Sequence, residues 1–265
     1  PAAGSILSIA EALTNIVWAP LSEGLDSVSL SANWMWPCKN EGEDARLYRA
    51  VEACSDFACS LGINIPTGKD SLSMTQKYGK DKVYSPGTVI ISAGAEVSDI
   101  RKVVSPVLRT GIDSTVYYID FSFDKLKLGG SAFAQSLDKI GKEVPTVQDS
   151  EYFANAFNAV QELINKELIL AGHDISAGGM ITTMLEMNFA NTEGGLEVSL
   201  DEIPEKDLVK ILFSENPGIL IQVEKTDEVE KILKKAGVAF IRLARPCDER
   251  HLLCLLYTSP SPRDP

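Results

Sequence analysis

The chain has 265 residues, of which 45% are hydrophobic and 23% are charged, and it carries a formal net charge of −12 at pH 7. This length and hydrophobic content are sufficient for one or two globular domains without help from disulfides or structural metals. The excess of negative charge argues against nucleic acid or an anionic membrane surface as a partner, because both recruit Lys and Arg.

The first third of the chain contains two predicted helices. Over residues 5–17, isoleucine and leucine recur at helical spacing, and Pro20 lies just beyond to stop the helix. Over residues 44–61, apolar side chains again form one stripe, which ends at Gly62. Both patterns predict helices that bury one face and expose the other.

After the second helix, the pattern changes to that of strands and loops. A short apolar strand is predicted over residues 63–66, and it runs into a polar loop, TGKDSLSM, at residues 67–74. The β-branched and apolar run over residues 87–97 predicts a buried strand. Ser105-Pro106 then begins the connection to a second unit.

The second unit is predicted to alternate strands and helices. It opens with a strand over residues 115–121, followed by a glycine turn at Gly129-Gly130 that leads into a helix. The other predicted helices cover residues 150–166, 179–191, 207–213 and 226–236, and the other predicted strands cover residues 195–200, 218–224 and 238–244. Such alternation predicts an α/β (α+β) fold in which helices cover a sheet.

The pattern divides the chain into three parts. We expect an N-terminal α/β domain at residues 1–105, which begins almost directly at its first helix and is therefore interpreted as truncated at its start. We expect a C-terminal α/β domain at residues 106–250. The regular pattern then stops and the composition changes abruptly to Ser and Pro, so residues 251–265 are interpreted as a disordered or artefactual tail.

The cysteines and the apolar runs indicate the compartment. There are five cysteines, an odd number without a CxxC pair, which indicates reduced thiols and a cytoplasmic location. No apolar run approaches the ~20 residues that span a bilayer, and the first stretch carries Glu11 with no basic residue before it. We therefore expect neither a signal peptide nor a membrane anchor.

Glu11 and Asn15 are the first candidate site residues. They lie four residues apart on the first predicted helix, so their oxygens project from the same face about one turn apart. Such a pair can share a hard divalent cation whose other positions go to water, another carboxylate and phosphate oxygens. The alternative is an ordinary polar stripe opposite the buried face of the helix.

The segment AGHDISAGG, residues 171–179, is the second candidate. Backbone can approach a ligand closely among its small residues, and its glycines open a helix whose N-terminus favours an anion. Asp174 can hold the cation that accompanies a phosphate, while an ordinary N-cap by Ser176 or Asp174 is the alternative. His173 is interpreted as a packed or turn histidine, because nothing in the sequence supplies it with a partner.

The third candidate is the loop that contains Gly68, Lys69 and Ser71. It lacks the G-x-x-x-x-G-K-[ST] pattern, and Lys69 is followed by Asp70, so a Walker site is rejected. A backbone amide, a cation and a hydroxyl at a strand-to-loop junction suit a phosphorylated substrate. The alternative is a polar turn with a solvated Lys69-Asp70 pair. A further loop, SENPG at residues 214–218, is interpreted as a structural turn.

Seven motifs in a fixed order resemble those of one enzyme family. They are IAEALTNIVWAPL, LSANWM, GEDARLYRAVEA, IPTGKDSLSM, LGGSAFAQ, GHDISAGGM and LFSENPGILIQV. Together they cover nearly the whole chain from Gly4 to Arg250. On these motifs the chain resembles the second synthetase half of the large phosphoribosylformylglycinamidine synthases, also called formylglycinamide ribonucleotide amidotransferases.

The resemblance implies an activity in de novo purine biosynthesis. The family is an ATP-dependent carbon–nitrogen ligase with glutamine as amide donor. It converts formylglycinamide ribonucleotide, ATP and ammonia from a glutaminase domain to formylglycinamidine ribonucleotide, ADP and phosphate. Because the chain resembles one half alone, we expect it to be inactive by itself. The alternatives are a non-catalytic structural nucleotide-binding half, or a fold relative such as aminoimidazole ribonucleotide synthetase.

The resemblance also implies a fold and a nucleotide site. The implied fold is the two-domain fold of aminoimidazole ribonucleotide synthetase, which pairs with a homologous first synthetase half. Glu11, Asn15 and Asp174 match magnesium ligands, and Ser176 matches a nucleotide contact at an ATP or ADP site. Many relatives have Asp where this chain has Ala177, and a further magnesium-binding Asp is expected before the first residue of this chain.

A second set of matches falls on the polar loop. Gly68, Lys69 and Ser71 match a loop that reaches toward a catalytic site shared with the first half, which implies contacts with substrate or ATP phosphates. None of the five cysteines matches the nucleophile of the glutaminase domain. The resemblance therefore implies a nucleotide site within this chain and a second phosphate site shared with another part of the enzyme.

Overall fold

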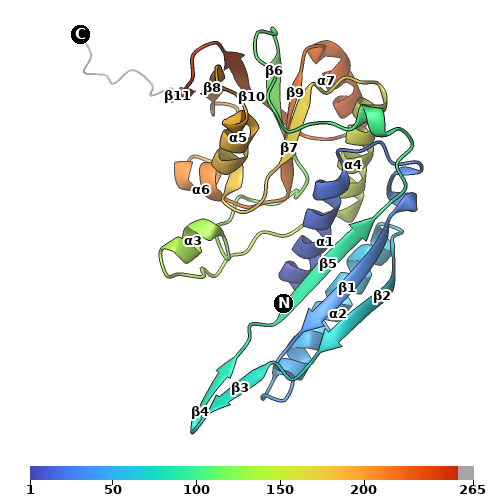
Figure 1. Cartoon of the computed structure of the whole chain (residues 1–265), viewed down its shortest axis with the longest axis vertical. Helices are drawn as coiled ribbons and strands as arrows, with labels where there is room; N and C mark the ends of the chain where they lie inside the picture. Colours follow the sequence, from blue (N-terminus) through green and yellow to red (C-terminus); the bar gives the residue numbers. More distant parts are fainter. Residues whose placement is uncertain (256–265) are drawn as a thin grey trace, which may run out of the picture.

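The computed structural model describes residues 1–255, whose helices and strands are shown in Figure 1. The first part of the chain contains α1 (Ala2–Ile16), η1 (Gly24–Ser27), β1 (Ser29–Met35), α2 (Glu43–Ser60), β2 (Asn64–Ser71), β3 (Thr75–Tyr78), β4 (Asp81–Tyr84), β5 (Thr88–Gly94) and η2 (Ile100–Lys102). The second part contains β6 (Thr115–Asp120), α3 (Ala132–Ser136), α4 (Ser150–Asn165), β7 (Ala171–Asp174), α5 (Gly179–Phe189), β8 (Gly195–Ser199), α6 (Leu208–Phe213), β9 (Gly218–Val223), α7 (Thr226–Lys235), β10 (Phe240–Cys247) and β11 (Leu252–Leu255).

Two sheets organise these elements. A three-stranded sheet has the order β2-β1-β5, and a six-stranded sheet has the order β11-β8-β10-β6-β9-β7. The hairpin β3-β4 projects beyond the three-stranded sheet, and α2 covers a face of that sheet beside α1 (Figure 1). In the six-stranded sheet, only the β11–β8 pair is parallel among the described strands. The mixed α/β fold predicted from the sequence is therefore confirmed.

Strand β6 lies inside the six-stranded sheet, and both of its faces are buried. Tyr117 and Ile119 point to a core that includes residues of α1, α2, α4 and α7. Val116 and Tyr118 point to the opposite face, where they meet a core that includes residues of α5 and α6. Because successive side chains of a strand alternate between faces, one apolar strand supplies both cores.

Four segments differ from the sequence prediction. The run over residues 87–97, predicted as a buried strand, forms β5, which is only partly buried, with Ile90 50% exposed. Residues 67–71, predicted as loop, continue β2 in parallel register with β1, because β1 supplies backbone partners for a polar segment. Residues 171–174, also predicted as loop, form β7 against β9. Within the predicted tail of residues 251–265, residues 252–255 form β11 against β8. The rest of that predicted tail, residues 256–265, lies outside the described residues.

A buried glutamine joins α1 to α4. The side-chain oxygen of Gln161 accepts a hydrogen bond from the backbone N–H of Leu21 at 2.8 Å. Its amide nitrogen donates to the carbonyl oxygens of Val17 at 2.7 Å and Ala19 at 3.1 Å. The backbone that leaves α1 would otherwise be buried without these partners, so Gln161 fixes where the helix ends.

The connection between the two parts packs closely on the second part. Gln222 donates to the carbonyl of Arg109 and accepts from its N–H, both at 2.8 Å. Apolar residues of α1 and α2 also share a core with β6, β9 and α4. A domain boundary between residues 105 and 106 stays a prediction. Among the described residues, no helix has both the length and the apolar character to cross a membrane.

Close packing of β1 and β2 predicts the cost of a side chain at Gly68. A Cβ atom there would lie 2.0 Å from the backbone oxygen of Ala32. We expect Gly68→Ala to lower the free energy of unfolding by about 1–3 kcal/mol, measured by urea denaturation, because the strands must separate.

The matched control is Gly94→Ala at the end of β5 in the same sheet, where a Cβ would meet nothing within 4 Å. We expect this control to change the free energy of unfolding by less than about 0.5 kcal/mol. Equal effects of the two substitutions would contradict the packing assignment.

Candidate functional site

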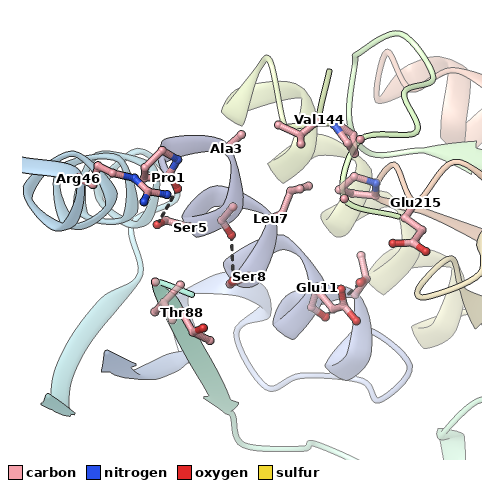
Figure 2. A pocket seen from close by; sticks show the side chains of 18 of the residues that line it. Pro1, Ala3, Ser5, Leu7, Ser8, Glu11, Arg46, Thr88, Val144 and Glu215 are labelled. Carbon is pink, nitrogen blue, oxygen red and sulfur yellow. Dashed lines mark hydrogen bonds between the residues drawn. The ribbon is translucent and has the colours of Figure 1, made fainter. Parts of the chain in front are cut away.

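A cavity of about 460 Å³ lies beside α1 (Figure 2). Leu7, Ser8 and Glu11 line it from α1, and Val144 and Glu215 line it from the other side, as Figure 2 shows. The remaining lining residues include several that are small or apolar, among them Gly4, Trp36, Gly87, Val89, Gly129, Gly130, Pro145, Ile175 and Pro217. A cavity with mostly apolar walls and a few polar groups has the general character of a small-molecule site.

Two of the sequence candidates meet at one end of this cavity. The hydroxyl of Ser176 donates a hydrogen bond of 2.7 Å to Oε1 of Glu11, although 165 positions separate the two residues. Ile175, which precedes Ser176, lines the cavity together with Glu11. The structure thus brings the face of α1 that carries Glu11 to the segment that follows β7.

Asp174 and His173 lie at the end of β7. The Asp174 side chain is buried, and its Oδ1 lies 3.3 Å from Nδ1 of His173. The other ring nitrogen of His173 lies 3.1 Å from Oε2 of Glu186 on α5. The hydrogen bond to Asp174 raises the pKa of His173, against the opposing effect of burial. The sequence did not supply a partner for His173, whereas in the structure both of its ring nitrogens face carboxylates.

Tight packing places β7 beside the end of α1. A Cβ atom on Gly172 would lie 2.2 Å from the ring of Trp18, so the indole occupies the space above this glycine. The N–H of Gly172 also donates to the carbonyl of Ser105 at 3.1 Å. Gly172 precedes Asp174 by two positions, so this contact sets the distance between β7 and the helix that bears Glu11.

Asn15 lies one helical turn beyond Glu11 and is exposed. Within residues 1–255, no group of three or more His, Cys, Asp or Glu side chains is arranged to hold a metal ion. Protein side chains of these types therefore do not form a closed metal cage in the described part of the chain. A cation at Glu11 would need other oxygen ligands, such as an amide, water or phosphate.

The start of α5 contacts a carboxylate of the chain itself. Its glycines, Gly178 and Gly179, have positive φ values of 93° and 75°, which these residues adopt without a Cβ penalty. The sequence predicts that this helix N-terminus favours an anion, and in the structure the N–H of Gly178, the N-cap of α5, donates to the Glu215 carboxylate at 2.8 Å. A carboxylate of the chain thus already occupies this helix N-terminus.

Glu215 is the site residue that the sequence reasoning missed. It belongs to SENPG, which was interpreted as a structural turn, and it lines the cavity opposite Glu11 (Figure 2). Its hydrogen-bond partners, Gly178 and Ala132, lie 37 and 83 positions away. No local pattern in the sequence predicts contacts of this separation.

Gly68, Lys69 and Ser71 lie elsewhere. All three are exposed residues of β2, an outer strand of the three-stranded sheet, and none of them lines the cavity. The structure does not bring them together with Glu11, Asp174 and Ser176. The sequence candidates therefore fall into two separate groups on the molecule.

Comparisons with known proteins agree along most of the chain. Residues 1–96 match the family described as "FGAR-AT PurM_N-like domain", and residues 115–251 match "AIR synthase related protein, C-terminal domain". Among curated relatives, "Probable phosphoribosylformylglycinamidine synthase" of Caenorhabditis elegans is 39% identical over 249 residues, covering 89% of this chain and 18% of that protein. "Phosphoribosylformylglycinamidine synthase" of Homo sapiens is 37% identical over 246 residues, covering 92% of this chain and 18% of that protein.

A plant relative and two solved structures extend the comparison. "Probable phosphoribosylformylglycinamidine synthase, chloroplastic/mitochondrial" of Arabidopsis thaliana is 41% identical, covering 89% of this chain and 16% of that protein. T. maritima PurL complexed with FGAR has a TM-score of 0.72 at 16% identity, over 97% of this chain and 41% of that chain. The E. coli hydrogenase maturation protein HypE has a TM-score of 0.65 at 16% identity, over 96% of this chain and 76% of that chain. These structures show the fold, and the chain spans less than a fifth of the length of its curated relatives.

The hydrogen bond between Glu11 and Ser176 predicts an energetic coupling between α1 and the segment after β7. In a double-mutant cycle of Glu11→Ala and Ser176→Ala, we expect a coupling of about 1 kcal/mol in the free energy of unfolding, measured by urea denaturation. The control cycle pairs Ser176→Ala with Asn15→Ala, because Asn15 lies on the same helix face as Glu11 while the Ser176 hydroxyl donates to Glu11. A coupling equal to that of the control would contradict the contact.

Proposed function

We propose a function from the premise that the chain belongs to the AIR synthase related protein family, whose C-terminal domain matches residues 115–251. Residues 1–96 match an FGAR-AT domain, and the curated relatives are named phosphoribosylformylglycinamidine synthases. Both observations support placing the chain among these synthases within the family. The chain is a synthetase-like part of a phosphoribosylformylglycinamidine synthase. It contributes an ATP or ADP site to the conversion of formylglycinamide ribonucleotide to formylglycinamidine ribonucleotide in purine biosynthesis.

The contact between Glu11 and Ser176 at the cavity is the observation that carries this proposal. It joins a carboxylate on a helix to a hydroxyl beside a glycine-containing turn, so groups that bind a cation and a phosphate lie together. Apolar residues such as Leu7, Val89 and Val144 offer a surface for the base and sugar of a nucleotide. The cavity volume, about 460 Å³, lies within the usual range for small-molecule sites.

Magnesium belongs to this proposal because of the charges in the cavity. Glu11 and Glu215 are both carboxylates, so a phosphate group beside them would meet repulsion without a cation. The Arg46 guanidinium also lines the cavity, but it is paired with Glu43 at 2.6 Å. The carboxylates of Glu11 and Asp174 and the amide oxygen of Asn15 are hard oxygen donors, and Mg²⁺ commonly takes one or two carboxylates with water and phosphate. These residues would hold the ion, and a bound ion would supply positive charge that offsets the charge of the phosphate. Ser176 would then contact the nucleotide directly.

The second group of candidates supports a second role. We propose that Gly68, Lys69 and Ser71 contact substrate or ATP phosphates together with a homologous first synthetase half. Lys69 offers a positive charge, and all three residues are exposed on β2. In the whole synthase, ammonia would come from glutamine through a glutaminase domain. The enzyme is then an ATP-dependent carbon–nitrogen ligase, with this chain as one part of it.

We propose a cytoplasmic location for this chain. All five cysteines are free thiols in the structure, as a reducing compartment would keep them. The Arabidopsis relative carries the words "chloroplastic/mitochondrial" in its name, so the compartment is not common to all relatives.

Magnesium-dependent binding of ADP tests the nucleotide site. We expect the chain to bind ADP with Mg²⁺ and the Asp174→Asn variant to bind at least about tenfold more weakly, measured by isothermal titration calorimetry with and without Mg²⁺. The matched control is Asp56→Asn, which makes the same chemical change on the exposed face of α2. Equal, metal-independent binding by the chain and its Asp174→Asn variant would remove Asp174 from the site.

A turnover assay tests the role of the chain within the synthase. We expect the chain alone, given formylglycinamide ribonucleotide, ATP, Mg²⁺ and ammonium, to form no formylglycinamidine ribonucleotide, because it spans 18% of the C. elegans relative. A full-length relative serves as the positive control, with ADP and product separated by chromatography. Product formation by the chain alone would overturn the expectation. If the full-length protein binds ADP tightly at this site but does not turn the nucleotide over there, the result would favour a structural role for that nucleotide.

A further inference from the structure

The 122–147 segment, which contains α3, forms one side of the cavity. Gly129, Gly130, Val144 and Pro145 of this segment line the cavity opposite α1. The segment closes on itself, because the N–H of Gly129 donates to the carbonyl of Glu143 at 2.8 Å and the N–H of Gly130 to that of Ile140 at 2.6 Å. In Figure 1, α3 extends away from the six-stranded sheet, so the segment depends on specific contacts to stay beside the cavity.

Glu215 makes one of these contacts and joins it to the start of α5. Its Oε1 accepts hydrogen bonds from the N–H of Ala132 at 2.7 Å and from the N–H of Gly178 at 2.8 Å. One carboxylate oxygen therefore connects the 122–147 segment to the turn that follows Asp174 and Ser176. Charge-assisted hydrogen bonds from backbone N–H groups are stronger than neutral ones, which suits this position between two helix starts.

The neighbours of Glu215 hold the same segment. Oδ1 of the buried Asn216 accepts from the N–H of Lys127 at 3.2 Å, and its amide nitrogen donates to the carbonyl of Lys125 at 3.0 Å. The ring of Phe213 stacks on that of Phe133, with centroids 4.8 Å apart. The residues on either side of Glu215 thus reinforce its contact, and the sequence SENPG is more than a turn.

We propose that Glu215 is a positioning residue that holds the 122–147 segment against the start of α5 and thereby fixes the side of the cavity that faces α1. It acts by accepting these two hydrogen bonds rather than by placing a charge beside the ligand. The effect of Glu215 on nucleotide binding rests on the proposed function. The position of the segment can be measured without any nucleotide.

Two substitutions remove the contact from opposite sides. Glu215→Ala removes the acceptor. Ala132→Pro removes one donor, and proline suits this first position of α3, because Ser131 before it has φ −64° and ψ 156°. Glu215→Gln is the matched control, since its amide oxygen can still accept both hydrogen bonds while the charge is lost.

The position of the segment is read out by limited trypsin digestion, because Lys139 and Lys142 are exposed within it. We expect Glu215→Ala and Ala132→Pro to speed cleavage at these lysines by about tenfold, the effect of losing ~1.4 kcal/mol of local stability. We expect Glu215→Gln to stay within about threefold of the unsubstituted chain. Circular dichroism verifies that each variant is folded, and Ala132→Pro decides the result if Glu215→Ala does not fold.

The affinity for ADP with Mg²⁺ is the second measurement, and it should follow the same order of variants. Unchanged cleavage in both Glu215→Ala and Ala132→Pro would overturn the inference. A second outcome would also overturn the inference. If Glu215→Gln leaves cleavage unchanged but weakens ADP binding as much as Glu215→Ala does, the charge of Glu215 acts on the ligand. If the unsubstituted chain binds no nucleotide but the cleavage rates follow the expected order, the proposed function fails and the positioning role stands.

Discussion

The placement of α1 is the constraint on which the rest of the site depends. This helix packs in the same core as α4, β6 and β9, and Gln161 satisfies the backbone that leaves it with three hydrogen bonds. Burying backbone N–H and C=O groups without partners costs more free energy than one hydrogen bond contributes net to stability. The end of α1 therefore has one favourable position. The opposite face of the helix is exposed and carries Glu11 and Asn15, and Glu11 lines the cavity.

Small residues determine how closely the supporting elements approach. Gly172 lies under the ring of Trp18, and this contact brings β7 to the end of α1. Gly68 lies against the backbone of Ala32, and this contact allows β2 to pair with β1 along its polar half. The first glycine serves the cavity, whereas the second shapes a sheet away from it. Close packing therefore explains why Gly68 is a glycine, without any phosphate ligand at this segment.

The carboxylates in the cavity support the proposal that a cation lies between the protein and a phosphate. Glu11 and Glu215 line opposite sides, and the helix N-terminus of α5 is already occupied by the Glu215 carboxylate. The positive end of that helix stabilises a side chain of the protein rather than an external anion. In the proposed function, recognition of a nucleotide depends on Glu11, Asn15, Asp174 and a bound ion, with Glu215 maintaining the shape of the cavity.

The sequence by itself determined the elements whose side chains repeat with a clear period. The apolar spacing of α1, α2 and α4 and the apolar runs of β5, β6 and β9 predicted these elements within a few residues. The four-residue spacing of Glu11 and Asn15 also placed both on one helix face. Such patterns are local, because a helix or a strand repeats its geometry every few residues.

Only the tertiary structure decided which polar segments became strands and which side chains met. The second half of β2 is polar and pairs because β1 lies beside it, and β7 is a strand because β9 offers it a free edge. The contact of Ser176 with Glu11, the carboxylates around His173 and the two bonds of Glu215 join residues far apart in the chain. Contacts of this kind leave no period in the sequence, since they depend on how the chain returns on itself rather than on neighbouring residues.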